Sequence, residues 1–144
     1  MNVNDDELRQ MLALMENYKN RVEQLTQHAQ VLRSTLDEVN MANQSIKALI
    51  DADEGDEIII PIGASSFMNV KVTSNKNIIV GVGSGISVEK SPEDASKFME
   101  ANAAEVSEAL KKTVDAVQEV QQALTTVSEA VQIEYMNRQQ TPTE

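Results

Sequence analysis

Apolar residues recur at alternating three- and four-residue spacings along two long segments, residues 4–50 and residues 91–138. We call each such row of positions a seam. A seam sustained over about six heptads is typical of a coiled coil, because a single helix on a globular core seldom exceeds ~25 residues. We therefore predict two long helices, which pair antiparallel if the chain folds back between them. The first seam comprises Leu8, Met11, Met15, Tyr18, Val22, Leu25, Ala29, Leu32, Leu36, Val39, Asn43, Ile46 and Ile50, and the second comprises Met99, Ala103, Val106, Leu110, Thr113, Val117, Val120, Leu124, Val127 and Val131.

Helix-start signals precede both seams. Asn4 is suited to cap the first helix, and Glu7 follows three residues later, where a capping box places an acid. Ser91 is suited to cap the second helix, with Pro92 at the first helical position and Asp94 at the capping-box site. The two helices are expected to begin next to these caps.

Residues 58–90 have a different pattern, in which short runs of isoleucine and valine alternate with glycine. We predict four short strands that form two hairpins, reached through an acidic connector at residues 51–57, and hence an α+β fold. Two-stranded hairpins are marginal alone because they bury little apolar area, so their edges are expected to pair in an oligomer. The candidate oligomerisation residues are Ile58, Ile60, Ile62, Phe67, Val70, Val72, Ile78, Val80, Val82, Ile86 and Val88.

Charge and composition narrow the function classes. The chain has 23 acidic and 12 basic residues, and its formal charge of −11 opposes binding to nucleic acid, which needs clustered lysine and arginine. It has no cysteine, so disulfides and thiolate metal sites are excluded. No apolar run approaches the ~18 residues that a membrane span requires, so we expect a cytoplasmic protein without a membrane partner. Residues 139–144 are expected to form a disordered tail.

No group of residues supports catalysis. His28 is the only histidine, and its place on a long helix without an evident cleft favours a surface residue over a catalytic or metal site. Gly81, Gly83 and Gly85 precede a strand, whereas a dinucleotide-binding loop has a different glycine spacing and precedes a helix. The acidic connector lacks the ligand and glycine positions of an EF-hand, so we interpret it as solvated. We expect no enzyme, cofactor or metal site.

Large apolar residues gather where the predicted helix pair would end. Leu12 and Leu14 flank the first seam, and Ile133, Tyr135 and Met136 lie off the second. Burial of one such side chain is worth roughly 1.5–3 kcal/mol, so several together could hold an apolar partner weakly. The alternative is that the tip simply splays or packs within an oligomer.

Two motifs between the helices resemble those of the prefoldin α-class subunits. Residues 61–67, PIGASSF, are similar to the strand-turn motif of that family, and residues 79–85, IVGVGSG, are similar to its second glycine motif. Two hairpins rather than one also favour the α class. The resemblance covers nearly the whole chain.

This resemblance implies a function and a set of partners. It implies a hexamer of two α and four β subunits joined through β-barrels, which holds unfolded proteins without ATP and delivers them to a group II chaperonin. The client-binding residues would be Leu8, Met11, Leu12, Leu14, Met15, Val131, Ile133, Tyr135 and Met136. The alternative is a structural or adaptor coiled-coil protein that binds one specific folded partner.

Overall fold

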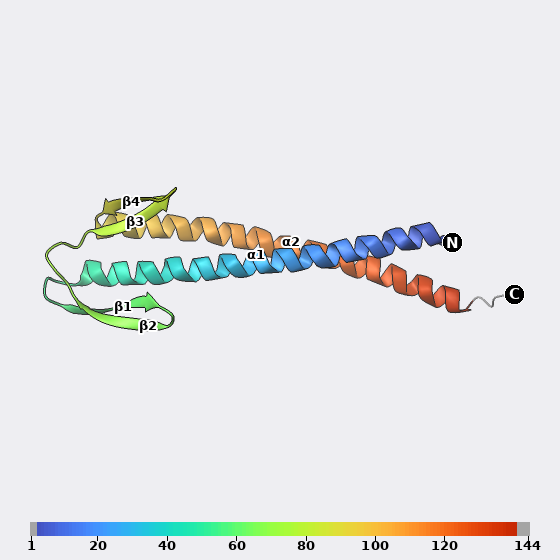
Figure 1. Ribbon diagram of the computed structural model, residues 1–144, viewed down its shortest axis with the longest axis horizontal. Helices are drawn as coiled ribbons and strands as arrows, with labels where there is room; N and C mark the ends of the chain where they lie inside the picture. The colour runs from blue at the N-terminus through green and yellow to red at the C-terminus, as the bar shows by residue number, and fades with distance from the viewer. Residues whose placement is uncertain (1–2, 141–144) are drawn as a thin grey trace. The chain divides into compact units, whose positions relative to one another are not determined.

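The computed structural model describes residues 3–140 and contains two long helices that are connected in the chain by two antiparallel hairpins (Figure 1). The chain divides into two compact units. The terminal unit consists of residues 3–31 and 109–140, and the hairpin unit consists of residues 32–108. The elements in chain order are α1 (Asp5–Asp51), β1 (Glu57–Gly63), β2 (Ser66–Lys71), β3 (Ile78–Gly83), β4 (Ile86–Lys90) and α2 (Pro92–Gln140).

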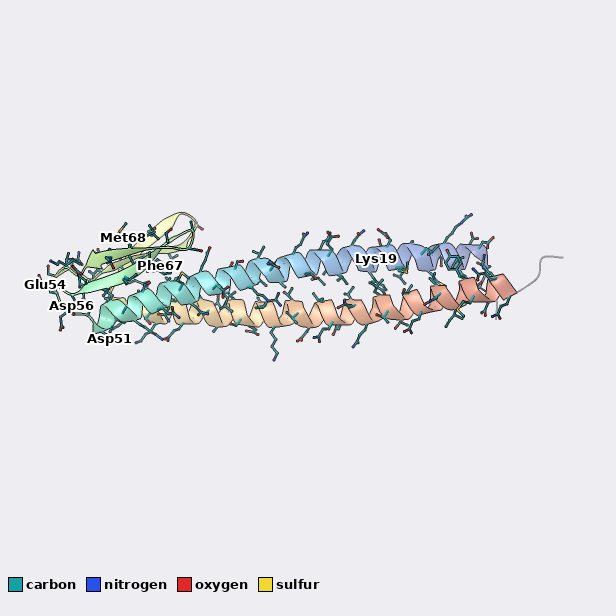
Figure 2. The ribbon with its side chains drawn as sticks, turned by 90° about the horizontal axis from the view of Figure 1, so that it is seen from below. Lys19, Asp51, Glu54, Asp56, Phe67 and Met68 are labelled. Atoms are coloured by element: carbon teal, nitrogen blue, oxygen red, sulfur yellow. The ribbon has the colours of Figure 1, made fainter. Side chains whose placement is uncertain are left out.

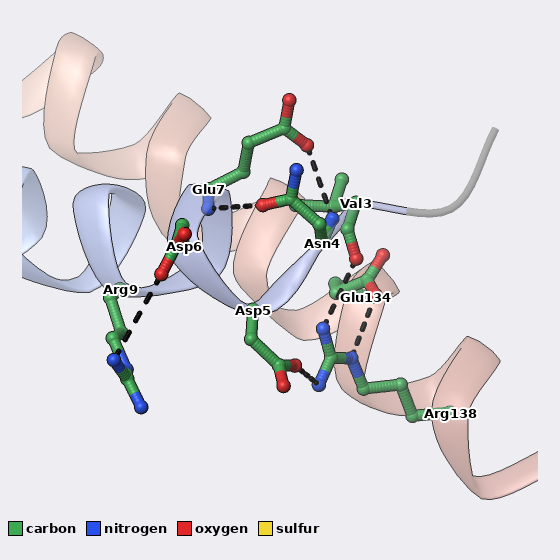
Figure 3. Close-up of polar contacts among 8 residues, drawn as sticks. All are labelled: Val3, Asn4, Asp5, Asp6, Glu7, Arg9, Glu134 and Arg138. Carbon is green, nitrogen blue, oxygen red and sulfur yellow. Dashed lines mark hydrogen bonds and ion pairs between the residues drawn. The ribbon is translucent and has the colours of Figure 1, made fainter.

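Both helices begin with the caps that their sequences indicate. The side-chain oxygen of Asn4 accepts a 2.8 Å hydrogen bond from the Glu7 amide, and the Glu7 carboxylate accepts one from the Asn4 amide at 3.2 Å (Figure 3). The Ser91 hydroxyl accepts a 3.2 Å hydrogen bond from the Asp94 amide at the start of α2. Such bonds satisfy amides that have no partner inside the helix.

The end of α2 differs from the expectation. The helix continues through Gln140, although a disordered tail was expected from residue 139. Residues 141–144, the rest of that expected tail, lie outside the described residues.

In the terminal unit, the start of α1 and the end of α2 pack together antiparallel. The seam side chains here are buried or half-buried, and Leu8, Ala29 and Val131 are among the most buried. The Thr113 hydroxyl, which is buried in the seam, donates a 2.8 Å hydrogen bond to the Ala109 carbonyl. This polar seam residue is therefore satisfied by its own helix.

In the hairpin unit, the end of α1 and the start of α2 meet under β3. Ile46, Val80 and Ala95 form the buried centre, with Ile50 and Phe98 among the half-buried side chains around it. Figure 1 shows β1 and β2 beside the end of α1, and β3 and β4 beside the start of α2. The four strands form two separate two-stranded sheets.

Both hairpins turn in the same way. The two-residue turns Ala64–Ser65 and Ser84–Gly85 have positive φ at both residues, as a type I′ turn requires, and each follows a glycine with a φ of 105°. A register irregularity precedes each turn, between Pro61 and Gly63 in one hairpin and between Gly81 and Gly83 in the other. The tight turns match the right-handed twist of the strands, so short hairpins form from these sequences.

The acidic connector is tied to the first hairpin through its backbone. The Gly55 amide donates to the Val72 carbonyl, and the Val72 amide donates to the Asp56 carbonyl, both at 2.8 Å. The Lys76 ammonium donates to the Ala52 carbonyl just beyond α1, a helix with no basic residue in its own last turn. A cation here is favoured by the helix dipole. The acidic side chains are exposed, as Figure 2 shows for Asp51, Glu54 and Asp56, but the backbone is held on both sides.

Candidate functional site

Exposed apolar side chains lie near the ends of the helices in the terminal unit. Ile133 and Met136 are more than half exposed, at 58% and 53%, and Leu14 and Tyr135 are also exposed. Leu12, which was expected beside them, is half-buried. Of the seam residues expected to bind clients, Met11 and Met15 are half-buried, and Leu8 and Val131 are buried. The expected set is therefore brought together, but part of it is covered by the packing of the two helices.

An arginine clasp joins the two helix ends beside this apolar set. Arg138 on α2 donates at 2.8 Å to the Glu134 carboxylate on its own helix and at 2.8 Å to Asp5 on α1. Its third bond, at 3.1 Å, is to the Val3 carbonyl (Figure 3). The hydrogen bonds that Arg138 donates, first to Glu134 and then to Asp5, raise the pKa of its guanidinium above the ordinary value. Arg138 therefore stays charged, and the clasp ties α1 to α2 near both ends of the chain.

The sequence contains a signal for this clasp that the seam analysis missed. Glu134 follows Val131 by three residues and Arg138 follows Glu134 by four, so both continue the spacing of the second seam. The predicted seam extends only to Val131, and the next two positions of the same spacing hold charged residues. The structure nevertheless buries Glu134, which is only 4% exposed.

The predicted oligomerisation residues fall into two groups. Those that face the helices of the same chain are buried or half-buried, and they are Ile58, Ile60, Val70, Val72, Ile78 and Val80. Those near the turns or on the outer side are exposed, and they are Ile62, Phe67, Val82, Ile86 and Val88. The first group stabilises the hairpins on their own helices, so only the second offers a free apolar surface.

Three exposed apolar residues of the hairpins were not predicted. Ile59 and Ile79 occupy equivalent places in β1 and β3 and are 63% and 75% exposed, and Met68 is 48% exposed. Figure 2 shows Phe67 and Met68 next to each other on the hairpin. The sequence contains a signal for this exposure. The strands carry isoleucine on both faces, at 58–60 and 78–79, so some isoleucine side chains point outward whichever face is buried.

An apolar groove of about 570 Å³ separates the end of α1 from the hairpins. Met41 and Leu49 line its helix side, and Ile60, Val70 and Ile79 line its strand side. The groove continues the exposed apolar surface of the hairpins into the interior of the hairpin unit.

Features of other site classes were sought in the described part of the chain. Between residues 3 and 140, no three His, Asp or Glu side chains are grouped as metal ligands would be. None of the described helices has an apolar stretch of the length that crosses a bilayer. His28 is exposed.

Comparison with known proteins assigns the family. The prefoldin subunit family model matches residues 18–136. The prefoldin subunit alpha of Methanothrix thermoacetophila is 32% identical over 108 residues, covering 75% of this chain and 71% of that protein. The prefoldin subunit alpha of Pyrococcus horikoshii is 34% identical over 116 residues, covering 75% of this chain and 78% of that protein.

A solved structure has the same fold. It is a chain of filamentous PFD from Methanocaldococcus jannaschii, determined by cryo-EM, with a TM-score of 0.51 and 22% identity. The likeness covers 87% of this chain and 98% of that chain. The solved structure therefore shares the fold of two long helices and two hairpins, and the family model assigns the chain to a class of chaperone subunits. The chain belongs to the prefoldin family, and its relatives named above are archaeal alpha subunits.

Proposed function

We propose that the chain is part of an ATP-independent holdase, which binds non-native proteins at the apolar tip of the terminal unit. The observation that carries this proposal is the exposure of Leu14, Ile133, Tyr135 and Met136 beside the paired helix ends. Exposed apolar side chains gathered at one end of a protein are a feature of sites that bind another molecule. The client would be a non-native chain, whose own apolar side chains are exposed.

The size of the cluster fits reversible holding. Complete burial of one large apolar side chain contributes roughly 1.5–3 kcal/mol, and these side chains are already about half covered. A single tip therefore binds weakly, and several tips in one complex bind tightly together through a high effective concentration. Met136, with its flexible thioether, adapts to clients of different shape. Weak contacts at each tip also allow release to a group II chaperonin, which we propose as the next partner.

Assembly is proposed to occur through the hairpins, with a β-type subunit in a hexamer of two α and four β chains. The support for this is the exposed apolar surface of Ile59, Phe67 and Ile79 together with two sheets of only two strands each. Such sheets have unpaired edges, which neighbouring chains can extend into barrels. The name of the relatives, subunit alpha, is consistent with a complex of more than one kind of chain.

Light scattering tests the holdase proposal. A denatured, aggregation-prone protein is diluted into buffer containing this chain and a β-type subunit, without ATP, and several unrelated clients are compared. Suppressed aggregation of all of them, followed by release when a group II chaperonin is added, is the expected result. A stable complex that suppresses none of them would contradict the proposal and favour an adaptor that binds one folded partner.

A further inference from the structure

The tip of the helix pair is closed by charged residues at positions that continue a mostly apolar seam. Glu134 and Arg138 continue the three- and four-residue spacing beyond Val131, and the Glu134 side chain is 6% exposed. Its carboxylate bonds to Arg138 at 2.8 Å, and Arg138 reaches across to Asp5 on α1. The last contact between the helices therefore depends on an ion pair.

An ion pair at this place is not the arrangement that would give the greatest stability. Apolar side chains of similar volume in place of a buried ion pair often leave a protein as stable or more stable, whereas removal of one partner leaves a buried charge that is strongly destabilising. The Asp5 side chain is 80% exposed, so its bond to Arg138 is screened by salt. The clasp is thus easier to open than the apolar seam that it extends.

Closure of the clasp hides part of the apolar surface. Leu8 is 8% exposed and Val131 is 5% exposed, and both lie within one helical turn of a clasp residue. On α2, Val131 lies two residues from the exposed Ile133 and five from the exposed Met136, and on α1, Leu8 lies six residues from the exposed Leu14. If the helix ends separated, Leu8 and Val131 would join that exposed set.

We propose that Arg138 is a positioning residue that holds the tip closed and thereby sets how much apolar surface the tip offers to a non-native protein. This inference rests on the proposed function and adds a way in which client binding is regulated. When the clasp opens, Leu8 and Val131 become part of the apolar surface that can contact a client. When it closes, both side chains are buried again.

Two variants should have opposite effects, because one opens the tip and the other keeps it closed. Arg138→Gln leaves the Glu134 carboxylate buried without its cation, so the helix ends should separate. Glu134→Val combined with Arg138→Leu continues the apolar seam, so the ends should stay closed. The matched control is Arg9→Gln, because Arg9 is also a terminal arginine paired with an acid, Asp6 at 3.9 Å, but that pair is exposed and lies on α1 alone (Figure 3).

Spin labels measure the separation directly. The chain has no cysteine, so Gln10→Cys and Gln132→Cys, both exposed positions, place one label on each helix near the tip. Pulsed electron paramagnetic resonance on labelled chain, diluted with unlabelled chain and assembled with a β-type subunit, gives the distance distribution. Circular dichroism checks that each variant keeps its helix content.

The expected results differ between the variants. Arg138→Gln should give a longer and broader distance and suppress aggregation at a several-fold lower concentration, whereas the apolar double variant should keep the short distance and require a higher concentration. Arg9→Gln should match the unmodified chain in both the distance and the concentration.

A wild-type distance in Arg138→Gln would show that the clasp does not hold the tip closed, even if clients are held. A longer distance with unchanged holding would overturn the link to clients, while failure of the unmodified complex to hold any client would overturn the proposed function itself.

Discussion

The Ser96 hydroxyl donates a 2.7 Å hydrogen bond to the side-chain oxygen of Asn43, joining α2 to α1 inside the hairpin unit. Asn43 is the only polar residue in the first seam, and Ser96 is 7% exposed. A polar pair inside a seam is satisfied in one register only, because a shift along the helix leaves both groups without a partner. The pair thus aligns the two helices next to the hairpins.

Asn43→Leu should lower the free energy of unfolding by about 1–3 kcal/mol, since the Ser96 hydroxyl would be left buried without its acceptor. Urea unfolding measures the change. In Asn43→Leu combined with Ser96→Ala, both polar groups are absent, and most of the stability should return. A single variant as stable as the double variant would show that the bond does not fix the register.

The turns of the hairpins give a second prediction. Gly85 has a φ of 73°, where a side chain is strained, so Gly85→Ala should cost about 1 kcal/mol and reduce the hydrogen-exchange protection of β3 and β4 about five-fold. Ser65 occupies the same place in the first turn with a φ of 58°, and Ser65→Gly should gain about 0.5 kcal/mol after the entropy cost of glycine.

Gly81→Ala is the control for the turns. Gly81 lies in β3 without a positive φ, and a methyl group there would meet no atom within 4 Å. In this variant the hydrogen exchange of β3 and β4 should stay close to that of the unmodified chain. Equal losses in Gly81→Ala and Gly85→Ala would mean that the flexibility of glycine or local packing, rather than turn geometry, decides the stability of the hairpin.

Assembly should depend on the exposed apolar side chains of the hairpins. Ile79 is 75% exposed in the single chain, so Ile79→Asp leaves the fold of the subunit unchanged but places a charge in any shared sheet, and the complex should sediment as smaller species. Val80→Asp is a poorer test because Val80 packs against Ile46 and Ala95 of its own chain. Ser84→Asp, at an exposed turn that tolerates aspartate, serves as the control and should sediment as the full complex.

Client holding should depend on the apolar tip and not on assembly. Replacement of Leu12, Leu14, Ile133 and Met136 with serine removes much of the exposed apolar area of the terminal unit. The variant should keep its sedimentation coefficient and lose most of its suppression of aggregation, because the hairpins are untouched. The comparison variant carries serine at Val31, which is 61% exposed but far from the tip in sequence, and it should hold clients normally. Lost assembly or undiminished holding in the tip variant would contradict the assignment.

The regular parts of the fold could be predicted from sequence because each depends on local spacing. The two seams, the Asn4 and Ser91 caps and the glycine-rich turns each reflect the geometry of a few neighbouring residues. Two long helices and two hairpins follow from them, and the structure confirms these elements.

Other features depend on contacts between distant residues, which spacing does not reveal. Isoleucine on both faces of β1 and β3 hides which row meets the helices, so Ile59 and Ile79 were not expected to be exposed. The clasp was missed because a charged residue at a seam position indicates the end of a seam unless its partner is known. That partner, Asp5, lies 133 residues away in the sequence.

The two hydrogen bonds between Val72 and the connector have a consequence for the length of the first hairpin. They place the Asp56 carbonyl 2.8 Å from the Val72 amide and the Gly55 amide 2.8 Å from the Val72 carbonyl, so the first hairpin leaves and rejoins the chain at a single point. Residues added at the Ala64–Ser65 turn would lengthen the hairpin at its far end and leave this base unchanged. The length of the first hairpin is therefore independent of the helix end from which it starts.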